Sequence, residues 1–280
     1  MKKKKHQIKM QRIPHILESV YFIMEVIADN QYSTTFHVLS QLNIELVLKL
    51  FKSIAPNTLF ENELQNCQIL CGAQNPDFIR YISSSRNEFI DDENFIVFEL
   101  AEKGSLDDYL NHIMTFDENS KKIIFWKIAK MVERLHHLKY CHRNLNFSNI
   151  LVNQQYHLKL GSFGSAKFYA NQNDEFEKAK KDDIKSLGIM LRSLVTDKID
   201  FKYKTNFWSL LSFNKSELNI SQDFKNLVDS MLDDNYQNRP YFPAIFGNSY
   251  FDSVRNQEDF QASEINLIER FRELDEFLHP

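Results

Sequence analysis

The spacing of apolar residues along this chain changes near residue 104, and the change limits the folds open to it. Before it, short runs rich in aromatic and β-branched residues are typical of strands, apart from one segment with helical spacing. After it, apolar residues recur at helical spacing over long segments. Strands first and helices second predict an α+β fold of two lobes, with a hinge near residues 99–104. The expected strands are 21–27, 34–39, 46–51, 78–82 and 95–100, and the expected helices are 57–73, 106–113, 119–138, 183–196, 222–232 and 263–278.

The composition excludes several classes of function. The chain has 280 residues, 43% of them apolar, which is enough for one large domain or two packed lobes. A net charge of −4 gives no basic footprint for nucleic acid, and no apolar run is long enough to predict a membrane span. The basic run 2–5 predicts a solvated tail, with a weak contact to anionic lipid as the alternative. Three cysteines favour a reducing compartment, most simply the cytoplasm, over a disulfide framework.

Two motifs lie close together in the middle of the chain. Residues 141–151 read Cys-His-Arg-Asn-Leu-Asn-Phe-Ser-Asn-Ile-Leu, and residues 161–164 read Gly-Ser-Phe-Gly. They resemble the catalytic loop H-R-D-L-K-x-x-N and the magnesium loop D-F-G of protein kinases. The resemblance implies a two-lobed protein-kinase-like fold, with a small β-rich N-lobe and a mainly helical C-lobe.

Further pieces of this resemblance follow in the family's order and cover about residues 20–251. They imply a basic and polar segment 1–18, a kinase-like domain 19–251, and an extension 252–280 that carries an amphipathic helix. Within the domain the N-lobe would span about 19–100 and the C-lobe about 104–251. The matching segments are 47–49 (V-A-I-K), 75–79 (H-P-N-I-V), 96–100 and 104–106 (the lobe hinge), 183–188 (D-x-W-S-L-G) and 238–240 with 249–251 (the closing R-P and aromatic pair).

The acids that carry phosphoryl transfer are absent from the matching positions. Asn144 stands where the family has the aspartate that accepts the substrate's proton, and an amide has no basicity near neutral pH. Asn146 replaces the loop lysine. Ser162 replaces the aspartate that binds magnesium, and a hydroxyl is a far weaker ligand for this ion. Asn149 matches the second metal ligand, but one neutral ligand makes a poor magnesium site. No catalytic residue and no metal site is therefore assigned.

The phosphate-covering loop of the family needs glycines, because backbone amides must approach the phosphates closely. Ala28, Asn30 and Ser33 occupy the three glycine positions, with Tyr32 at the aromatic tip. The sequence therefore predicts no ordinary phosphate-cradling loop.

Lys49 matches the lysine that pairs with phosphates, and its alternative role is that of an ordinary strand lysine. Counting back from Pro76 places Asn66 where the family has the glutamate partner of this lysine, with Glu63 one turn earlier. An amide forms no ion pair, so Glu63 is expected to pair with Lys49 only if the helix is rotated.

A bound nucleotide, if there is one, is expected to be ATP without Mg²⁺. Val47 replaces the small residue above the adenine and crowds that space, while Phe98 closes it from behind as the gatekeeper. By the resemblance, the nucleotide contacts would come from Lys49, Glu99, Ala101, Asn149 and Leu151.

The residues that hold the fold together are present. The resemblance implies that His142 and Phe163 belong to the stacked apolar column of the family. Arg143 and Asp183 match the pair that anchors the catalytic loop to the core helix. The presence of these residues predicts a structural role for them, and it is no evidence of catalytic activity.

The stretch between Gly164 and Asp183 is short for a kinase. The family places there a longer activation segment and a peptide-docking loop that ends in A-P-E, and this chain has no A-P-E. Glu175 or Glu177 is expected to pair with Arg239 in place of the missing glutamate. The peptide-docking platform is therefore expected to be absent.

Three functions remain open, and the first is favoured. A pseudokinase would serve as a scaffold or allosteric binding module, with another protein as partner and an oligomeric state that the sequence does not give. An atypical active Ser/Thr kinase would need a displaced acid such as Asp107, Asp108 or Asp182. A metal-independent nucleotide-binding switch would keep Lys49 and Asn149 without transferring phosphate. The helix 263–278 is expected to pack on its own domain, with a partner-binding helix as the alternative.

Overall fold

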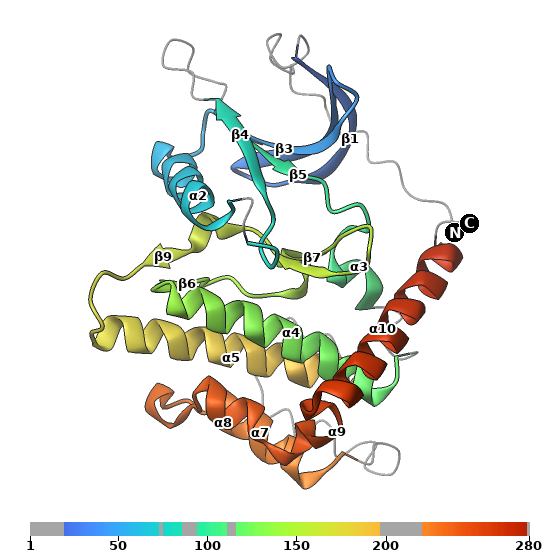
Figure 1. The fold of residues 1–280 in the computed structure, drawn as a ribbon. Helices are drawn as coiled ribbons and strands as arrows, with labels where there is room; N and C mark the ends of the chain where they lie inside the picture. Colours follow the sequence, from blue (N-terminus) through green and yellow to red (C-terminus); the bar gives the residue numbers. More distant parts are fainter. Residues whose placement is uncertain (1–19, 73–74, 86–93, 111–115, 197–219, 279–280) are drawn as a thin grey trace. The chain divides into compact units, whose positions relative to one another are not determined.

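The computed structural model describes residues 20–72, 75–85, 94–110, 116–196 and 220–278. The chain divides into two compact units. Unit 1 comprises Met1–Gln74 and Arg80–Leu100, and unit 2 comprises Asn75–Ile79 and Ala101–Pro280. Unit 1 is built mainly of strands and unit 2 mainly of helices (Figure 1). The predicted two-lobed α+β fold is therefore confirmed, and the change of unit lies inside the expected hinge.

The described residues of unit 1 form a five-stranded antiparallel sheet and helix α2. Its strand order is β1-β2-β3-β5-β4, so β1 and β4 form the two edges. Residues rich in branched and aromatic side chains form the strands, and helical spacing of apolar residues forms α2, as predicted. The elements are β1 (Tyr21–Asp29), β2 (Ser33–Ser40), β3 (Glu45–Phe51), α2 (Asn57–Leu70), β4 (Tyr81–Ser85) and β5 (Phe95–Glu99).

Alternation along these strands gives the sheet two different faces. One face carries a buried apolar cluster, against which Tyr21 and Ile23 of β1 pack. Val47 and Lys49 alternate with members of this cluster along β3, so they lie on the opposite face. The cluster consists of Phe36, Val38, Leu46, Leu48, Phe95 and Val97.

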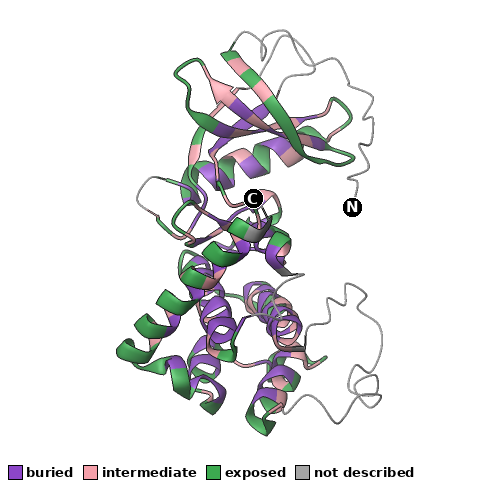
Figure 2. Ribbon diagram, turned by 90° about the vertical axis from the view of Figure 1, so that its right-hand side faces the viewer, coloured by how far each residue is buried: buried purple, intermediate pink, exposed green. Residues whose placement is uncertain are grey.

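Unit 2 is organised around two long helices, α4 and α5, which lie side by side (Figure 1). Helix α7 packs on α5 and α10 packs on α4. Buried positions follow the inner sides of these helices and exposed positions their outer sides (Figure 2). The helices are α3 (Leu106–Leu110), α4 (Glu118–His137), α5 (Asp174–Thr196), α7 (Gln222–Leu232), α8 (Phe242–Phe246), α9 (Asp252–Arg255) and α10 (Gln257–Leu278).

Short strands and turns of unit 2 connect α4 to α5. Two small antiparallel pairs form, β6 with β9 and β7 with β8. The apolar runs on either side of the turn at Asn153 pair with each other. The strands are β6 (Tyr140–Cys141), β7 (Ile150–Val152), β8 (Leu158–Leu160) and β9 (Lys167–Phe168).

Several element ends agree with local capping chemistry. Asp117 precedes α4 and accepts a hydrogen bond from the backbone N–H of Ser120 at 2.9 Å. Ser221 caps α7, since its hydroxyl accepts a hydrogen bond from the backbone N–H of Phe224 at 3.2 Å.

Several expected boundaries were wrong. Helix α10 begins at Gln257 rather than at residue 263, and α2 ends at Leu70 rather than at residue 73. Two further differences have a cause in the packing. Helix α5 begins at Asp174 rather than at residue 183, because acids fill its first turn and Phe176 and Ala179 bury its early face against Cys141. The strand expected from residue 78 begins at Tyr81, because Phe78 forms an isolated bridge to Leu160 and belongs to unit 2.

Helix α10 packs on the rest of unit 2. Phe271 is fully buried and makes edge contacts with the rings of Tyr109 and Phe116 at 5.0 and 5.2 Å. Lys103 Nζ lies 2.5 Å from the carboxylate of Asp275 and ties the end of the helix to the start of unit 2. Ile265, expected on the same apolar stripe, is 58% exposed. Among the described residues, no helix is long and apolar enough to cross a membrane.

Candidate functional site

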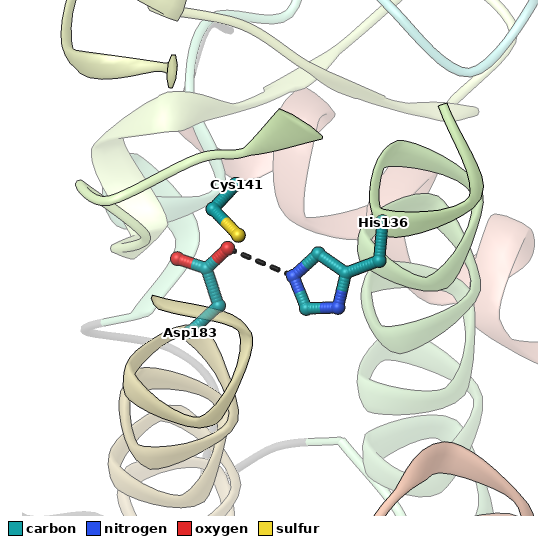
Figure 3. A group of neighbouring side chains, drawn as sticks. All are labelled: His136, Cys141 and Asp183. Carbon is teal, nitrogen blue, oxygen red and sulfur yellow. Dashed lines mark hydrogen bonds and ion pairs between the residues drawn. The ribbon is translucent and has the colours of Figure 1, made fainter. Parts of the chain in front are cut away.

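The loop that carries the central motif is anchored on one carboxylate of α5. Asp183 is almost fully buried, and its Oδ2 accepts a hydrogen bond from the backbone N–H of His142 at 2.8 Å. Its Oδ1 accepts from the backbone N–H of Arg143 at 2.9 Å. The ring of His136 on α4 adds a third contact, with Nε2 at 2.9 Å from Oδ2 (Figure 3). Asp183 thus anchors the loop through the backbone amides of His142 and Arg143, and not through the Arg143 side chain that the resemblance pairs with it. Sequence reasoning missed His136, although it lies on the last turn of a predicted helix.

Cys141 lies beside this pair (Figure 3). In the part of the chain that the structure describes, one group of three His, Cys, Asp or Glu side chains could hold a metal ion. It consists of His136, Cys141 and Asp183, whose ligand atoms lie within 4.8 Å of one another. Burial raises the pKa of the Cys141 thiol well above its usual value, with the nearby Asp183 carboxylate adding to the effect. The thiol is therefore protonated, and Asp183 already accepts three hydrogen bonds. The group therefore anchors the loop, through the hydrogen bonds of Asp183 and the buried thiol of Cys141.

His142 is fully buried and connects the two motifs of unit 2. Burial lowers the pKa of its ring, so the ring is neutral. Its Nε2–H donates to the backbone oxygen of Gly161 at 2.9 Å, and its Nδ1 accepts from the backbone N–H of Asn144 at 3.3 Å. The ring makes an edge contact with Phe163 at 5.5 Å, and Phe163 makes another with Phe78 at 5.2 Å. This stack fixes the relative position of the two motifs.

The asparagines of the loop bind one another. Asn149 Nδ2 donates to the backbone oxygen of Asn144 at 2.7 Å. Asn146 Nδ2 donates to the same oxygen at 3.2 Å and to the side-chain oxygen of Asn144 at 3.3 Å. Ser148 Oγ donates in turn to Asn146 Oδ1 at 2.5 Å. Side chains at the catalytic-acid and loop-lysine positions are therefore engaged in holding the shape of the loop, and none of them carries a charge.

Ser162 has a left-handed backbone conformation, with φ 62° and ψ 59°. Such a conformation is uncommon for a residue with a side chain and costs on the order of 1 kcal/mol. The buried Phe163 that follows holds it in place, while the Ser162 side chain stays exposed. The position expected for a magnesium ligand therefore presents one hydroxyl group to solvent.

In unit 1, Lys49 is paired with a buried acid. Its Nζ lies 2.6 Å and 2.8 Å from the two carboxylate oxygens of Glu63, which is 4% exposed. Helix α2 thus places Glu63 opposite β3, and the alignment that put Asn66 opposite Lys49 was wrong.

The turn between β1 and β2 binds its own backbone amides. Asn30 Oδ1 accepts from the backbone N–H of Tyr32 at 2.8 Å and from that of Ser33 at 2.9 Å. Asn30 N–H donates to the backbone oxygen of Ser33 at 3.0 Å, and Lys52 Nζ donates to the backbone oxygen of Asn30 at 2.6 Å. The amides of Tyr32 and Ser33 therefore point at a side chain of the turn itself. The spacing Asn-x-x-Ser is a recognisable signal for such a turn.

Strand pairing places a polar cluster on the same face of the sheet as Lys49. His37 lies opposite Val47, and Val47 lies opposite Phe98. His37 Nε2 is 3.1 Å from Glu45, and its Nδ1 is 3.8 Å from Glu25. Val47 and Phe98 are thus neighbours on adjacent strands, and the crowding expected at the adenine position stays a prediction.

The other positions expected to contact nucleotide are distributed over both units. Glu99, in unit 1, accepts a hydrogen bond from the backbone N–H of Arg80 at 2.9 Å. Ala101 is buried in unit 2. Leu151 bridges to Ser105 in unit 2 and lies close to Gly161.

The segment after the second motif folds back at once into a helix. Cys141 pairs with Lys167 across β6 and β9, and the chain then enters α5 at Asp174. Tyr169 stacks on Phe176 at 5.1 Å between ring centroids, and both rings share a buried cluster with Cys141. The first two turns of α5 therefore occupy part of the stretch in which the family places a peptide-docking loop.

Arg239 is held by α5, although not by the expected acids. Its Nη1 lies 2.8 Å from the carboxylate of Asp182 and 2.9 Å from the backbone oxygen of Lys181. Glu175 pairs with Lys167, and Glu177 accepts from Tyr241 at 3.2 Å. The expectation that Glu175 or Glu177 would pair with Arg239 was wrong, because Arg239 lies beside Lys181 and Asp182, at least one helical turn further along α5.

The chain belongs to the protein kinase domain family. The family's sequence pattern, described as protein kinase domain, matches residues 21–181, more than half of the chain. The two-lobed α+β fold and the Asp183-anchored loop are what this membership requires.

Three curated relatives are Ser/Thr or phosphoinositide-dependent protein kinases by name. The chain is 27% identical over 242 residues to 3-phosphoinositide-dependent protein kinase B of Dictyostelium discoideum, covering 77% of this chain and 25% of that protein. It is 26% identical over 152 residues to Serine/threonine-protein kinase dst1 of the same organism, covering 54% and 20%. It is 28% identical over 134 residues to Testis-specific serine/threonine-protein kinase 5 of Mus musculus, covering 39% and 36%. The matches thus span about a quarter, a fifth and a third of these relatives.

Proposed function

We propose that this kinase domain does not transfer phosphate and acts as a scaffold or allosteric binding module for another protein. The observation that carries the proposal is the catalytic loop itself. Asn144 stands at the position of the acid, and the amides of Asn146 and Asn149 are hydrogen-bonded to it. The loop thus keeps its anchored shape through Asp183 but offers no base to a substrate hydroxyl.

Two further features support the same proposal. The β1–β2 turn donates the amides of Tyr32 and Ser33 to Asn30, so they are not directed at a phosphate. Helix α5 starts at Asp174, which leaves little chain for a loop that could hold a peptide substrate. Each feature affects a different part of the reaction.

Two of the three acids that an atypical active kinase would need, Asp108 and Asp182, are engaged elsewhere. Asp108 accepts hydrogen bonds from the backbone N–H and the hydroxyl of Ser105 at the start of α3. Asp182 pairs with Arg239. Burial raises the pKa of Asp107, with the neighbouring Asp108 adding to the effect. The contacts of Asp108 and Asp182 favour a domain that does not transfer phosphate.

A phosphotransfer assay tests the proposal. The protein is incubated with radiolabelled ATP, Mg²⁺ or Mn²⁺ and a broad set of protein substrates. We expect incorporation no higher than that of the Lys49→Ala variant. Turnover by the wild type that Lys49→Ala abolishes, and that the surface variant Lys130→Ala retains, overturns the proposal.

A second candidate function is binding of a nucleotide without metal. The ion pair between Lys49 and Glu63 favours it, because this pair holds the ammonium group in place on the sheet face that carries Val47. We expect millimolar ATP to raise the melting temperature by about 2 °C, equally with and without Mg²⁺. No shift, or the same shift in Lys49→Ala, rules this function out.

We further propose that the protein acts in a reducing compartment. All three cysteines are free and buried. Labelling with a thiol reagent after denaturation of protein isolated from its cells would report three reactive thiols.

A further inference from the structure

A groove of about 500 Å³ opens on the surface of unit 2. Its walls come from α4, from the first half of α10, from the start of β8, and from Pro76 and Asp77, which belong to the same unit. Pro76, Arg134 and His157 are exposed, so the groove is open to solvent along its rim. The volume lies in the range of specific binding sites and far exceeds the space of one water molecule. None of the lining residues belongs to the catalytic-loop motif.

The floor of the groove is apolar and held in place. Met131 on α4 and Leu158 on β8 line it and are only 3% and 7% exposed. The half-buried ring of Trp126 is fixed by Phe246 and Phe251, with ring centroids 4.6 and 5.5 Å away. Side chains that are fixed in advance lose little conformational entropy when a ligand binds. The groove is therefore prepared for an apolar side chain.

The two ends of the groove differ in their charges. At one end Lys127 and Glu264 form an ion pair between α4 and α10, with side chains 23% and 28% exposed. At the other end Arg134 is 50% exposed, and its Nη1 lies 3.0 Å from Asp77 Oδ2 and 3.4 Å from Asn75 Oδ1. Both contacts use the same nitrogen, so the other N–H groups of this guanidinium have no acceptor among the described residues.

These free donors favour an acidic ligand. A guanidinium binds a carboxylate through two parallel hydrogen bonds, whereas a basic residue would meet Arg134 as a like charge. The ring of His157, on the wall beside β8, also has no partner in the described part of the chain and can donate a further hydrogen bond.

We propose that the groove binds a short segment of a partner protein that carries one large apolar side chain and one carboxylate close to it. The apolar side chain lies over Met131 and Leu158, and the carboxylate binds Arg134. Met131 and Arg134 are three residues apart on α4, about 4.5 Å along the helix axis. An extended segment advances about 3.3 Å per residue, so the acid is expected within about three positions of the apolar residue.

This inference rests on the proposed binding function and names the kind of partner. A protein segment fits better than a small molecule, because small-molecule sites enclose most of the ligand surface and this groove has an exposed rim.

Selection from a phage library of random peptides of about ten residues on the full chain tests the proposal. We expect the enriched peptides to carry a large apolar residue with Asp or Glu within about three positions. A fluorescein-labelled copy of the most enriched peptide should bind the full chain with a Kd of about 1 to 100 µM by fluorescence anisotropy, since the interface is small.

Charge reversal separates recognition from an effect on folding. Arg134→Glu should weaken peptide binding at least about tenfold, and a peptide whose acid is replaced by Lys should bind this variant better than the original peptide does. Arg272→Glu makes the same change at an exposed position of α10 outside the groove and should bind like the wild type. A circular dichroism spectrum of each variant checks folding.

Trp126 gives a signal from the groove itself. The chain has two tryptophans, so Trp208→Phe leaves Trp126 as the only one. Adding the peptide to this variant should change the fluorescence emission of Trp126, because the apolar side chain displaces water from the groove.

Four results would overturn the inference: no enrichment, enriched peptides without the acid, equal effects of Arg134→Glu and Arg272→Glu, or an unchanged Trp126 emission. Self-association of the wild type that Arg134→Glu abolishes would assign the groove to a second copy and overturn it too. Phosphotransfer activity, in contrast, overturns the proposed function and leaves peptide binding in the groove as measured.

Discussion

The ammonium group of Lys49 on β3 lies within hydrogen-bonding distance of both carboxylate oxygens of Glu63 on α2, at 2.8 and 2.6 Å. Glu63 is nearly inaccessible to solvent, so removing either residue takes a close partner away from the other. The pair fixes the helix against the sheet in unit 1, whatever its role toward a nucleotide.

A double-mutant cycle with Lys49→Met and Glu63→Gln measures this dependence. Because the pair is largely shielded from water, we expect a coupling of about 1 to 3 kcal/mol in the free energy of unfolding. The exposed pair Lys130–Glu133 on α4 serves as the control, with a coupling below about 0.5 kcal/mol. Equal couplings for the two pairs would contradict the prediction.

His142 makes the stability dependent on pH. Burial lowers the pKa of its ring below the usual 6.5, so the unfolded chain binds a proton there that the folded chain refuses. The free energy of unfolding should therefore fall as the pH drops below 6.5, by up to about 1.4 kcal/mol per pH unit until the folded pKa is reached.

Urea titrations between about pH 7.5 and pH 5.5 give this slope, since the window spans the unfolded pKa. His142→Phe keeps a ring against Phe163 but removes the proton site, so its slope should be smaller than that of the wild type. His157→Gln, at an exposed position, should leave the slope unchanged. An undiminished slope in His142→Phe shows that other groups are responsible.

Helix α10 should stabilise unit 2 mainly through one side chain. Replacing the fully buried Phe271 with Ala removes its ring contacts with Tyr109 and Phe116, and we expect a loss of about 3 to 5 kcal/mol. Ile265→Ala on the exposed side of the same helix should cost less than about 0.5 kcal/mol. Similar losses for both variants would mean that α10 does not pack as described.

The turn at Asn30 should be held by its side chain. Asn30→Ala removes the acceptor for two backbone amides, and we expect a loss of about 1 kcal/mol and faster hydrogen exchange at Tyr32 and Ser33. Gln31→Ala, between the same residues, should change neither. Unchanged exchange in Asn30→Ala would refute the assigned hydrogen bonds.

Much of the fold could be predicted from the sequence. The branched and aromatic runs of β1 to β3 and the long apolar stripe of α4 are strong local signals, and they appear where the patterns place them. The loop around His142 was found because several residue types recur at fixed spacing. Asp183, distant in sequence, could be joined to that loop through the family resemblance alone.

The remaining site residues depend on contacts that a linear pattern does not contain. Glu63 and Asn66 lie on one helix, and the choice between them depends on how α2 is rotated against β3. The early start of α5 follows from the burial of Phe176 against Tyr169, a side-chain contact made only once the chain has turned back on itself. His136 reaches Asp183 because α4 and α5 lie side by side, and only the tertiary structure shows this.

The early start of α5 has a consequence for how this domain could change over evolutionary time. Acids could return at positions 144 and 162 by single substitutions. A peptide-docking loop could not, because the residues that would form it are already turns of a helix whose face is buried against Cys141. Gaining such a loop would require an insertion of new chain together with the breaking of that helix, so it would take far more than a point substitution.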